Sequence, residues 1–148
     1  MAIRTDHKWF EVKGAPESRL RKADPFDFQC RLKRGPMLLV GEGNLSFSLA
    51  LAKKVRKPFS LVATTYDHVN KISPRAKRNA ETLKKGGVKV LHGVNATRLH
   101  KTFRRAFSTV VFQFPNTGDR RSVYGRTSNH HLVRRFLTSC DKILIRNG

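Results

Sequence analysis

The chain has 148 residues, about the length of one domain, and 39% of them are hydrophobic, too many for a wholly disordered polymer. Its 31 Lys and Arg residues against 10 Asp and Glu give a formal net charge of +21. Such an excess favours a polyanionic partner, namely RNA, DNA or an anionic membrane surface. A ribosomal-type basic protein and a merely solvated surface are the alternatives at this point.

Several classes of protein are excluded at once. The only two cysteines, Cys30 and Cys140, cannot form a disulfide framework or a CxxC zinc site, and they fit a reducing compartment. No apolar run approaches the roughly 20 residues that span a bilayer, and the N-terminus lacks the apolar segment of a secretory signal. The histidines show no HxxxH spacing, so no metal site is expected. We expect an intracellular protein without a membrane partner, cytoplasmic, or nucleolar in a eukaryote.

The charge divides the chain into two parts. Residues 1–35 hold 9 Lys and Arg and 5 Asp and Glu, a net of +4, and Pro16 and Pro25 interrupt them. This part is expected to be a basic N-terminal extension, either a poorly ordered tail or a segment whose aromatic residues pack on the domain or touch a partner. Residues 36–148 hold 22 basic and 5 acidic residues, a net of +17, and form the expected folded domain.

The first strand and helix of that domain are predicted around a glycine turn. Residues 37–40 are a short apolar run typical of a buried parallel strand, and it ends in Gly41-Glu42-Gly43. Residues 45–55 then show helical spacing, with Asn44 or Ser46 as the cap.

Three further strand–helix pairs follow. We predict a strand over 59–65, a helix from Ser73-Pro74 to Lys85, a strand over 88–94, a short basic helix over 99–106 and a strand over 109–114. Asn129 is predicted to cap a last helix. Its expected buried stripe consists of Leu132, Val133, Phe136, Leu137, Cys140, Ile143 and Leu144. Four βα units in a row predict an α/β fold, a Rossmann-like parallel sheet with helices on both faces.

The glycine turn is the strongest chemical signal. In Gly41-x-Gly43-x-x-Ser46, serine stands where the dinucleotide fingerprint has its third glycine, which disfavours NAD and an oxidoreductase. Glu42 inside the turn would repel a pyrophosphate. It suits a ligand with a cation instead, such as the amino group or sulfonium of S-adenosylmethionine.

Three other motifs follow the later strands. Asp67 comes 24 residues after Gly43, near the position of the acid that hydrogen-bonds ribose hydroxyls, and its alternative role is a turn cap. Asn95, in Gly93–Thr97, has an amide that can pair with an adenine edge, and its alternative role is an Asn turn. Gln113–Asn116 closes the last strand. Because ligands of open α/β sheets bind outside the carboxyl ends of the strands, all four motifs are expected at one crevice.

These residues carry a resemblance to a known family. LLVGEGNLSFSLALA, VLHGVNATRLH, VVFQFPN and the RRFLTSC helix together resemble the Rossmann-like domain of the rRNA uridine-N3 methyltransferase-like family, over roughly residues 36–148. The resemblance implies an S-adenosylmethionine-dependent methyltransferase that acts on RNA. It implies that Gly41, Glu42, Gly43, Asn44 and Ser46 surround the methionine end of the cofactor, that Asp67 holds the ribose, and that Asn95 and Ala96 lie near the adenine. Gln113, Phe114, Pro115 and Asn116 would face the methyl-accepting base.

The chain departs from the family pattern in three places. The family usually has aspartate at the position of Asn95, and its eukaryotic members favour Asn-Phe-Pro-His where this chain has Gln113–Asn116. The family fold also continues past the position of Gly148 toward a seven-stranded sheet. We therefore expect an incomplete sheet that a further C-terminal segment or a partner chain completes.

Two functions compete on this evidence. The first is N3-methylation of a uridine in rRNA, and the second is a non-catalytic RNA-binding or ribosome-associated module derived from a methyltransferase. In both, arginines near the last loop and helix are the expected phosphate contacts: Arg120, Arg121, Arg126, Arg134 and Arg135.

Overall fold

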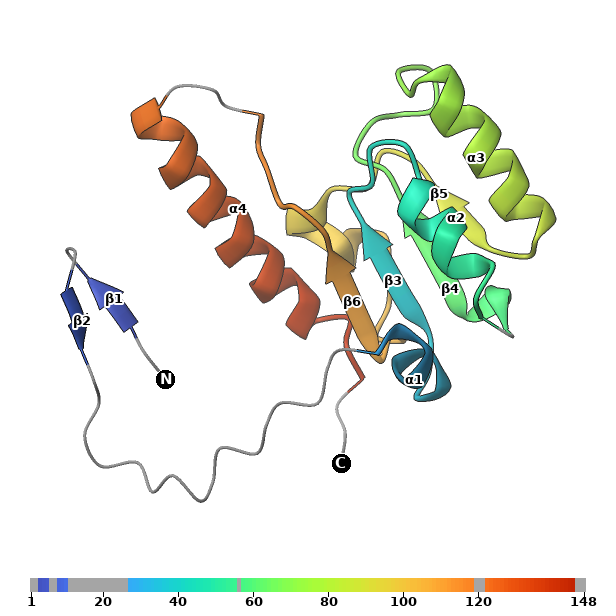
Figure 1. Cartoon of the computed structure of the whole chain (residues 1–148), viewed down its shortest axis with the longest axis horizontal. Helices are drawn as coiled ribbons and strands as arrows, with labels where there is room; N and C mark the ends of the chain where they lie inside the picture. The colour runs from blue at the N-terminus through green and yellow to red at the C-terminus, as the bar shows by residue number, and fades with distance from the viewer. Residues whose placement is uncertain (1–2, 6–7, 11–26, 56, 119–121, 146–148) are drawn as a thin grey trace.

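A computed structural model describes residues 3–5, 8–10, 27–55, 57–118 and 122–145 of the chain. Its centre is a four-stranded, all-parallel sheet in the order β5-β4-β3-β6 (Figure 1). The strands are β3 (Met37–Val40), β4 (Leu61–Thr64), β5 (Lys89–Leu91) and β6 (Thr109–Phe112). The predicted α/β, Rossmann-like fold is confirmed, with fewer strands than the seven of a complete methyltransferase sheet.

The central strands are buried on both faces, which explains their unbroken apolar sequences. All four residues of β3 are at most 1% exposed. Because successive side chains point to opposite faces, Met37 and Leu39 belong to one core cluster, and Leu38 and Val40 belong to the other. The sheet therefore has a hydrophobic core on each side.

Each face of the sheet is covered by helices (Figure 1). Residues of α2 (Ser46–Ala52) and α3 (Pro74–Lys85) pack in the core cluster of Leu39, whereas η3 (Ala96–Lys101) and α4 (Ser122–Asp141) contact one another on the other face. The predicted bounds of α3 are confirmed. Ser73 caps it by accepting a hydrogen bond from the Ala76 N–H at 3.2 Å.

The predicted bounds of β3 are also confirmed, whereas the other predicted elements differ from theirs. The predicted helix over 45–55 is shorter, and the predicted strand over 59–65 begins with a single 3-10 turn, η2 (Pro58–Ser60). The strands predicted over 88–94 and 109–114 cover only Lys89–Leu91 and Thr109–Phe112. The predicted helix over 99–106 is wrong, because Asn95 caps a 3-10 helix that begins at Ala96 and ends at Lys101.

The start predicted for the last helix is also wrong. α4 begins at Ser122, and Asn129 lies inside it, where its side-chain Oδ1 accepts a hydrogen bond from the Thr117 N–H at 2.8 Å. Leu137, which was expected in the buried stripe, is 60% exposed. The reason is that the core contacts of α4 run through Phe136 and Cys140, and Leu137 lies about 100° around the helix from Phe136. Ile143 is fully buried but follows the end of the helix.

Parts of residues 1–35 have structure of their own. β1 (Ile3–Thr5) and β2 (Lys8–Phe10) pair as an antiparallel hairpin. α1 (Phe28–Lys33) packs on the core, where the Phe28 ring meets the Phe47 ring of α2 edge to face with centroids 5.2 Å apart. Phe28 therefore packs on the domain, which was one of the roles expected for the aromatic residues of this segment. The division of the chain near residue 36 stays a prediction.

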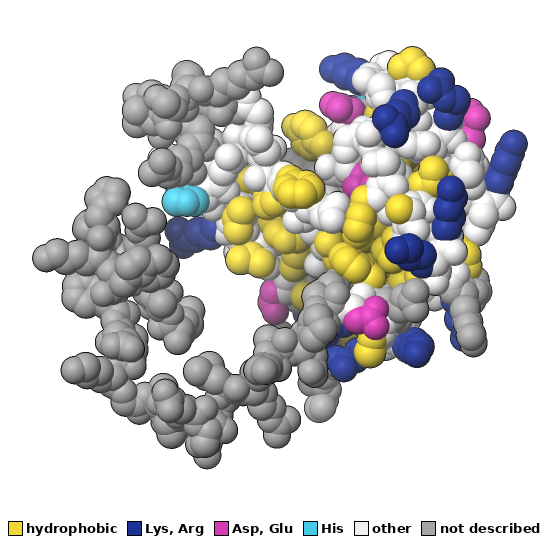
Figure 2. All heavy atoms as spheres, viewed as in Figure 1, with side chains coloured by type: hydrophobic (Ala, Val, Ile, Leu, Met, Phe, Trp, Pro, Cys, Tyr) yellow, Lys and Arg dark blue, Asp and Glu magenta, His cyan; other side chains and the backbone are white. Residues whose placement is uncertain are grey.

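The segment after α4 contacts the segment that leads into β6 through an isolated bridge. Leu144 bridges to Phe107 in parallel, and the Ile145 N–H donates to the Phe107 carbonyl at 2.8 Å. Residues 144–145 therefore run parallel to the residues that lead into β6. Figure 2 shows apolar side chains gathered on the viewed face over β6 and β3, between α4 and α2. None of the helices in the described part of the chain is long and apolar enough to cross a membrane.

Candidate active site

The strand order puts the expected crevice at the carboxyl ends of β3 and β6. The chain passes outward from β3 to β4 and β5, and then returns to the other side of β3 for β6. Ligands of open α/β sheets bind at such a reversal. Hydrogen bonds join the loops that follow β3, β4 and β5. The Glu42 N–H donates to the Thr64 carbonyl at 2.9 Å, and the Gly93 N–H donates to the Asp67 carbonyl at 3.1 Å.

The two glycines of the turn have different roles. Gly41 has φ +69°, and a Cβ on it would lie 2.6 Å from Cε2 of Phe112, so this position requires glycine. A Cβ on Gly43 would meet no heavy atom within 4 Å. Gly41 therefore shapes the turn, whereas Gly43 leaves its backbone open to a ligand.

Glu42 caps the helix that follows the turn. Its Oε2 accepts from the Ser48 N–H at 3.1 Å, and its Oε1 accepts from the Ser48 hydroxyl. The N-cap residue Leu45 has a left-handed backbone and makes no side-chain cap. The predicted cap, Asn44 or Ser46, is therefore wrong: the Asn44 Oδ1 accepts from the Ser46 N–H at 3.0 Å from outside the helix, and Ser46 is exposed in its first turn.

The environment of Glu42 decides which ligands suit the turn. Burial raises the pKa of its carboxyl, although hydrogen bonds from Ser48 and from the Phe47 backbone oppose the shift. Its carboxylate sits against the N–H groups that would otherwise bind a phosphate. A pyrophosphate is therefore excluded from the first turn of α2, and a cationic group is favoured beside Glu42.

Asp67 presents a free carboxylate at the end of β4. Its backbone carbonyl is held by the Thr65 hydroxyl at 2.8 Å and by Gly93, but its exposed side chain has no hydrogen-bond partner among the described residues. Tyr66 beside it is 68% exposed. Sequence reasoning missed Tyr66, although an aromatic residue next to the acid at a strand end was a usable signal.

The loop after β5 is held by two histidines that the sequence did not single out. The Thr65 Oγ1 lies 2.8 Å from His92 Nδ1, and burial, with the charge of Lys84, lowers the pKa of His92. The ring of His68 lies against Gly93, where a Cβ would meet it at 2.5 Å. These contacts fix the loop that carries Asn95.

Asn95 forms the local turn that was its alternative role. Its Oδ1 accepts from the Thr97 N–H at 2.9 Å and from the Thr97 hydroxyl at 2.8 Å. Its side-chain NH₂ group has no described partner and is available as a donor. Ala96 is buried, so it offers a ligand only its backbone.

The segment Gln113–Asn116 ends β6 with a strained aromatic residue. Phe114 has φ +50° and is 88% exposed, and a bulky residue in this backbone region is uncommon outside functional sites. Gln113 and Pro115 are half-buried, and Asn116 is exposed and accepts from the Gly118 N–H at 2.8 Å. The fold thus presents Phe114 to solvent beside the crevice.

The expected phosphate contacts are placed only in part. Arg134 and Arg135 are exposed on α4, and Arg126 belongs to the same helix. Arg120 and Arg121 lie outside the described residues.

A parallel sheet whose strand order reverses beside β3, with an acid after its second strand, defines a Rossmann-like α/β domain. Residues 38–148 match the family described as rRNA (uridine-N3-)-methyltransferase BTM5-like. The chain belongs to this family.

Curated relatives place the same region inside longer proteins. The chain is 36% identical over 126 residues to "Heavy metal-associated isoprenylated plant protein 41" of Arabidopsis thaliana, covering 76% of this chain and 24% of that protein. It is 33% identical over 117 residues to "Ferredoxin-fold anticodon-binding domain-containing protein 1" of Homo sapiens, covering 76% of this chain and 18% of that protein. The chain thus spans a quarter or less of these two relatives. No solved structure shows significant similarity to it.

Proposed function

We propose that this chain binds S-adenosylmethionine and transfers its methyl group to N3 of a uridine in rRNA. The observation that carries the proposal is the Glu42 carboxylate at the first turn of α2, at the reversal of the sheet. It disfavours the phosphates of a dinucleotide and favours a cationic ligand. Family membership supports the same choice of cofactor and substrate.

The described residues fit this cofactor at three points. Glu42 offers a carboxylate to the amino group, Gly43 leaves space beside its backbone, and Asp67 has a free carboxylate for the ribose hydroxyls. Asn44 and Ser46 would line the methionine end with them, and the Asn95 NH₂ and the Ala96 backbone would meet the adenine. When bound, the cofactor supplies an electrophilic methyl group.

The segment after β6 would position the accepting base. Phe114 would stack on the uracil ring, and the side-chain amides of Gln113 and Asn116 would donate to the carbonyl oxygens beside N3, with Pro115 holding the segment. These four residues include no carboxylate, so the N3 proton would leave to solvent. The positive surroundings favour the resulting anion, and most of the rate would come from positioning and electrostatics. The base must be unstacked to reach this site.

A second function belongs to the same chain, namely RNA binding without catalysis on a methyltransferase-derived domain. The observation that favours it is that the Asn95 Oδ1 accepts hydrogen bonds from Thr97, so this oxygen does not serve a cofactor. Both functions would place the protein inside the cell with rRNA as its partner. They differ only in whether methyl transfer occurs.

Methyl transfer to rRNA tests the proposal. The full chain is incubated with methyl-labelled S-adenosylmethionine and deproteinised rRNA, and nucleosides are analysed after digestion. We expect label in N3-methyluridine, and loss of that label with Phe114→Ala. If rRNA and cofactor both bind and no uridine is labelled, the non-catalytic function holds and the proposed reaction is wrong.

A further inference from the structure

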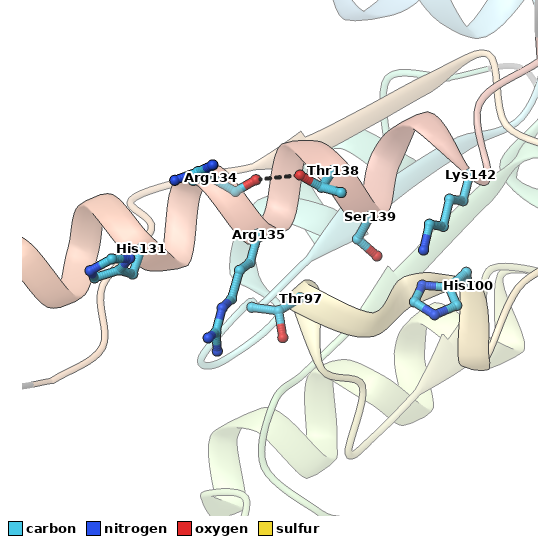
Figure 3. Close-up of a pocket in the computed structure, with 8 residues that line it drawn as sticks. All are labelled: Thr97, His100, His131, Arg134, Arg135, Thr138, Ser139 and Lys142. Carbon is cyan, nitrogen blue, oxygen red and sulfur yellow. Dashed lines mark hydrogen bonds between the residues drawn. The ribbon is translucent and has the colours of Figure 1, made fainter.

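A concave site lies between η3 and α4, beside the loop that carries Asn95 (Figure 3). This cavity, the η3–α4 groove, has a volume of about 290 Å³. It is lined by Thr97, His100, His131, Arg134, Arg135, Thr138, Ser139 and Lys142.

The fixed positive charges of the groove come from α4 and the residue that follows it, while η3 contributes His100. Five of its eight lining residues carry cationic or titratable nitrogens, and none of the eight is an Asp or Glu. In Figure 3 Arg135 extends from α4 toward Thr97, and Lys142 extends toward His100, while Arg134 lies along another side of the helix. Within the described residues no carboxylate pairs with Arg135 or Lys142, so both remain available to an anion.

The two walls are fixed to each other. The Leu99 N–H of η3 donates to the Ser139 hydroxyl of α4 at 2.7 Å, and Ser139 is 2% exposed. Leu99 and Phe136 belong to the same core cluster beneath. The cationic side chains therefore project from a rigid base, which lowers the entropy cost of holding a ligand.

The groove also leads away from the crevice. Thr97 comes two residues after Asn95, and Lys142 precedes Ile143, whose carbonyl accepts from the Phe107 N–H just before β6. Arg135 and Lys142 are separated by about 10 Å along the helix, so they can contact different phosphates. An RNA strand whose base enters the crevice could follow this route.

We propose that the η3–α4 groove binds the phosphodiester backbone of the RNA substrate. The identity of the strand as RNA rests on the proposed function, but the contacts do not depend on methyl transfer. Arg135 and Lys142 supply the charge, and the Thr97 hydroxyl supplies a neutral donor. Such contacts set the register of a strand without reading its sequence.

His100 makes the groove sensitive to pH. The His100 side chain is exposed, and slight desolvation and the nearby charges of Lys142 after α4 and of Lys101 and Arg98 on η3 lower its pKa. This shift favours the neutral imidazole, whereas a phosphate beside it would favour the protonated form. We expect RNA affinity to rise as the pH falls from about 7.5 to 5.5, and this rise to shrink in His100→Gln.

Anisotropy titrations of a fluorescent 12-nucleotide oligouridine test the groove. The full chain is compared with the double variant Arg135→Gln/Lys142→Gln and with the charge-matched control Lys84→Gln/Lys85→Gln, which alters exposed residues of α3 on the other face of the sheet. We expect the groove variant to lose on the order of tenfold in affinity and its log–log salt slope to fall by about 1.4, with little change in the control. Equal losses in the two variants would overturn the proposal.

Two further measurements separate the proposals. The affinity of the chain for oligoglutamate is compared with its affinity for oligouridine. Equal affinities, with the same decrease in the groove variant, would contradict a phosphodiester ligand. S-Adenosylmethionine binding should be unchanged in the groove variant. If the wild type does not bind the cofactor but the groove variant has reduced RNA affinity, the proposed reaction is wrong and the RNA-binding role of the groove is supported. If the cofactor binds and the groove variant keeps its RNA affinity, only the groove fails.

Discussion

The Glu42 carboxylate accepts hydrogen bonds from both the backbone N–H and the hydroxyl of Ser48, six residues later in the chain. This pair closes the glycine turn onto the first turn of α2, where Leu45 offers no capping side chain. The same carboxylate therefore stabilises the helix and sets the charge that a ligand meets in the turn.

The first prediction concerns the pH dependence of stability. Because the pKa of Glu42 is raised in the folded protein, its protonated form is favoured there. Its favourable contribution is complete below the unfolded pKa of about 4.5 and is lost as the pH rises through the raised value. Relative to Glu42→Gln, the wild type should lose free energy of unfolding between pH 4.5 and 7. Denaturant titrations of both proteins between pH 4.5 and 7 measure this loss of free energy of unfolding. If the free energies of the two proteins change in parallel with pH, Glu42 does not titrate as inferred.

The second prediction separates the two glycines. Gly41→Ala should lower the free energy of unfolding by about 1–3 kcal/mol, because alanine at φ +69° is strained and its Cβ meets the Phe112 ring. Gly43→Ala should leave stability within about 0.5 kcal/mol, since its Cβ meets nothing. It should nevertheless weaken cofactor binding. Thermal unfolding and cofactor titration of both variants test this, and a stable Gly41→Ala protein would contradict the geometry of the turn.

The third prediction concerns the exposed aromatic ring after β6. Phe114→Ala should leave stability within about 0.5 kcal/mol, because the side chain is 88% exposed. RNA affinity should fall by about 1–3 kcal/mol if the ring stacks on a base. Leu137→Ala is the control, since Leu137 is also apolar and 60% exposed. An equal effect of the two variants on RNA binding would argue against stacking by Phe114.

Much of the fold was predictable because local signals and burial agree. The apolar run of β3 indicates only a buried strand. Ser73-Pro74 and Gly86 mark the start and the end of α3 without an alternative. The alternation of strands and helices then limits the sheet to parallel pairing. The carboxyl-end crevice follows from that topology without knowledge of any contact.

The details that failed depend on tertiary contacts. The Asn129 side chain bonds to Thr117, twelve residues earlier, and nothing near Asn129 in the sequence indicates that it lies within a helix. The exposure of Leu137 depends on which side of α4 meets the sheet and η3. The basic groove was only partly predictable, because Arg134 and Arg135 were chosen from the sequence whereas His100 and Lys142 join them only in the fold.

The fourth prediction concerns the ribose contact. Asp67→Ala should weaken S-adenosylmethionine binding by about 1–3 kcal/mol, the range for a hydrogen bond to a charged group, without loss of stability. Glu81→Ala, which removes an equally exposed carboxylate on α3, is the control. Equal affinity of Asp67→Ala and the wild type would remove Asp67 from the ribose site.

Calorimetric titration of the full wild-type chain with S-adenosylmethionine is the decisive measurement of cofactor binding. We predict saturable binding with one site per chain, accompanied by an increase in the midpoint of thermal unfolding that grows with cofactor concentration. The absence of both heat and thermal stabilisation at saturating cofactor, in a chain that still binds RNA, would contradict it.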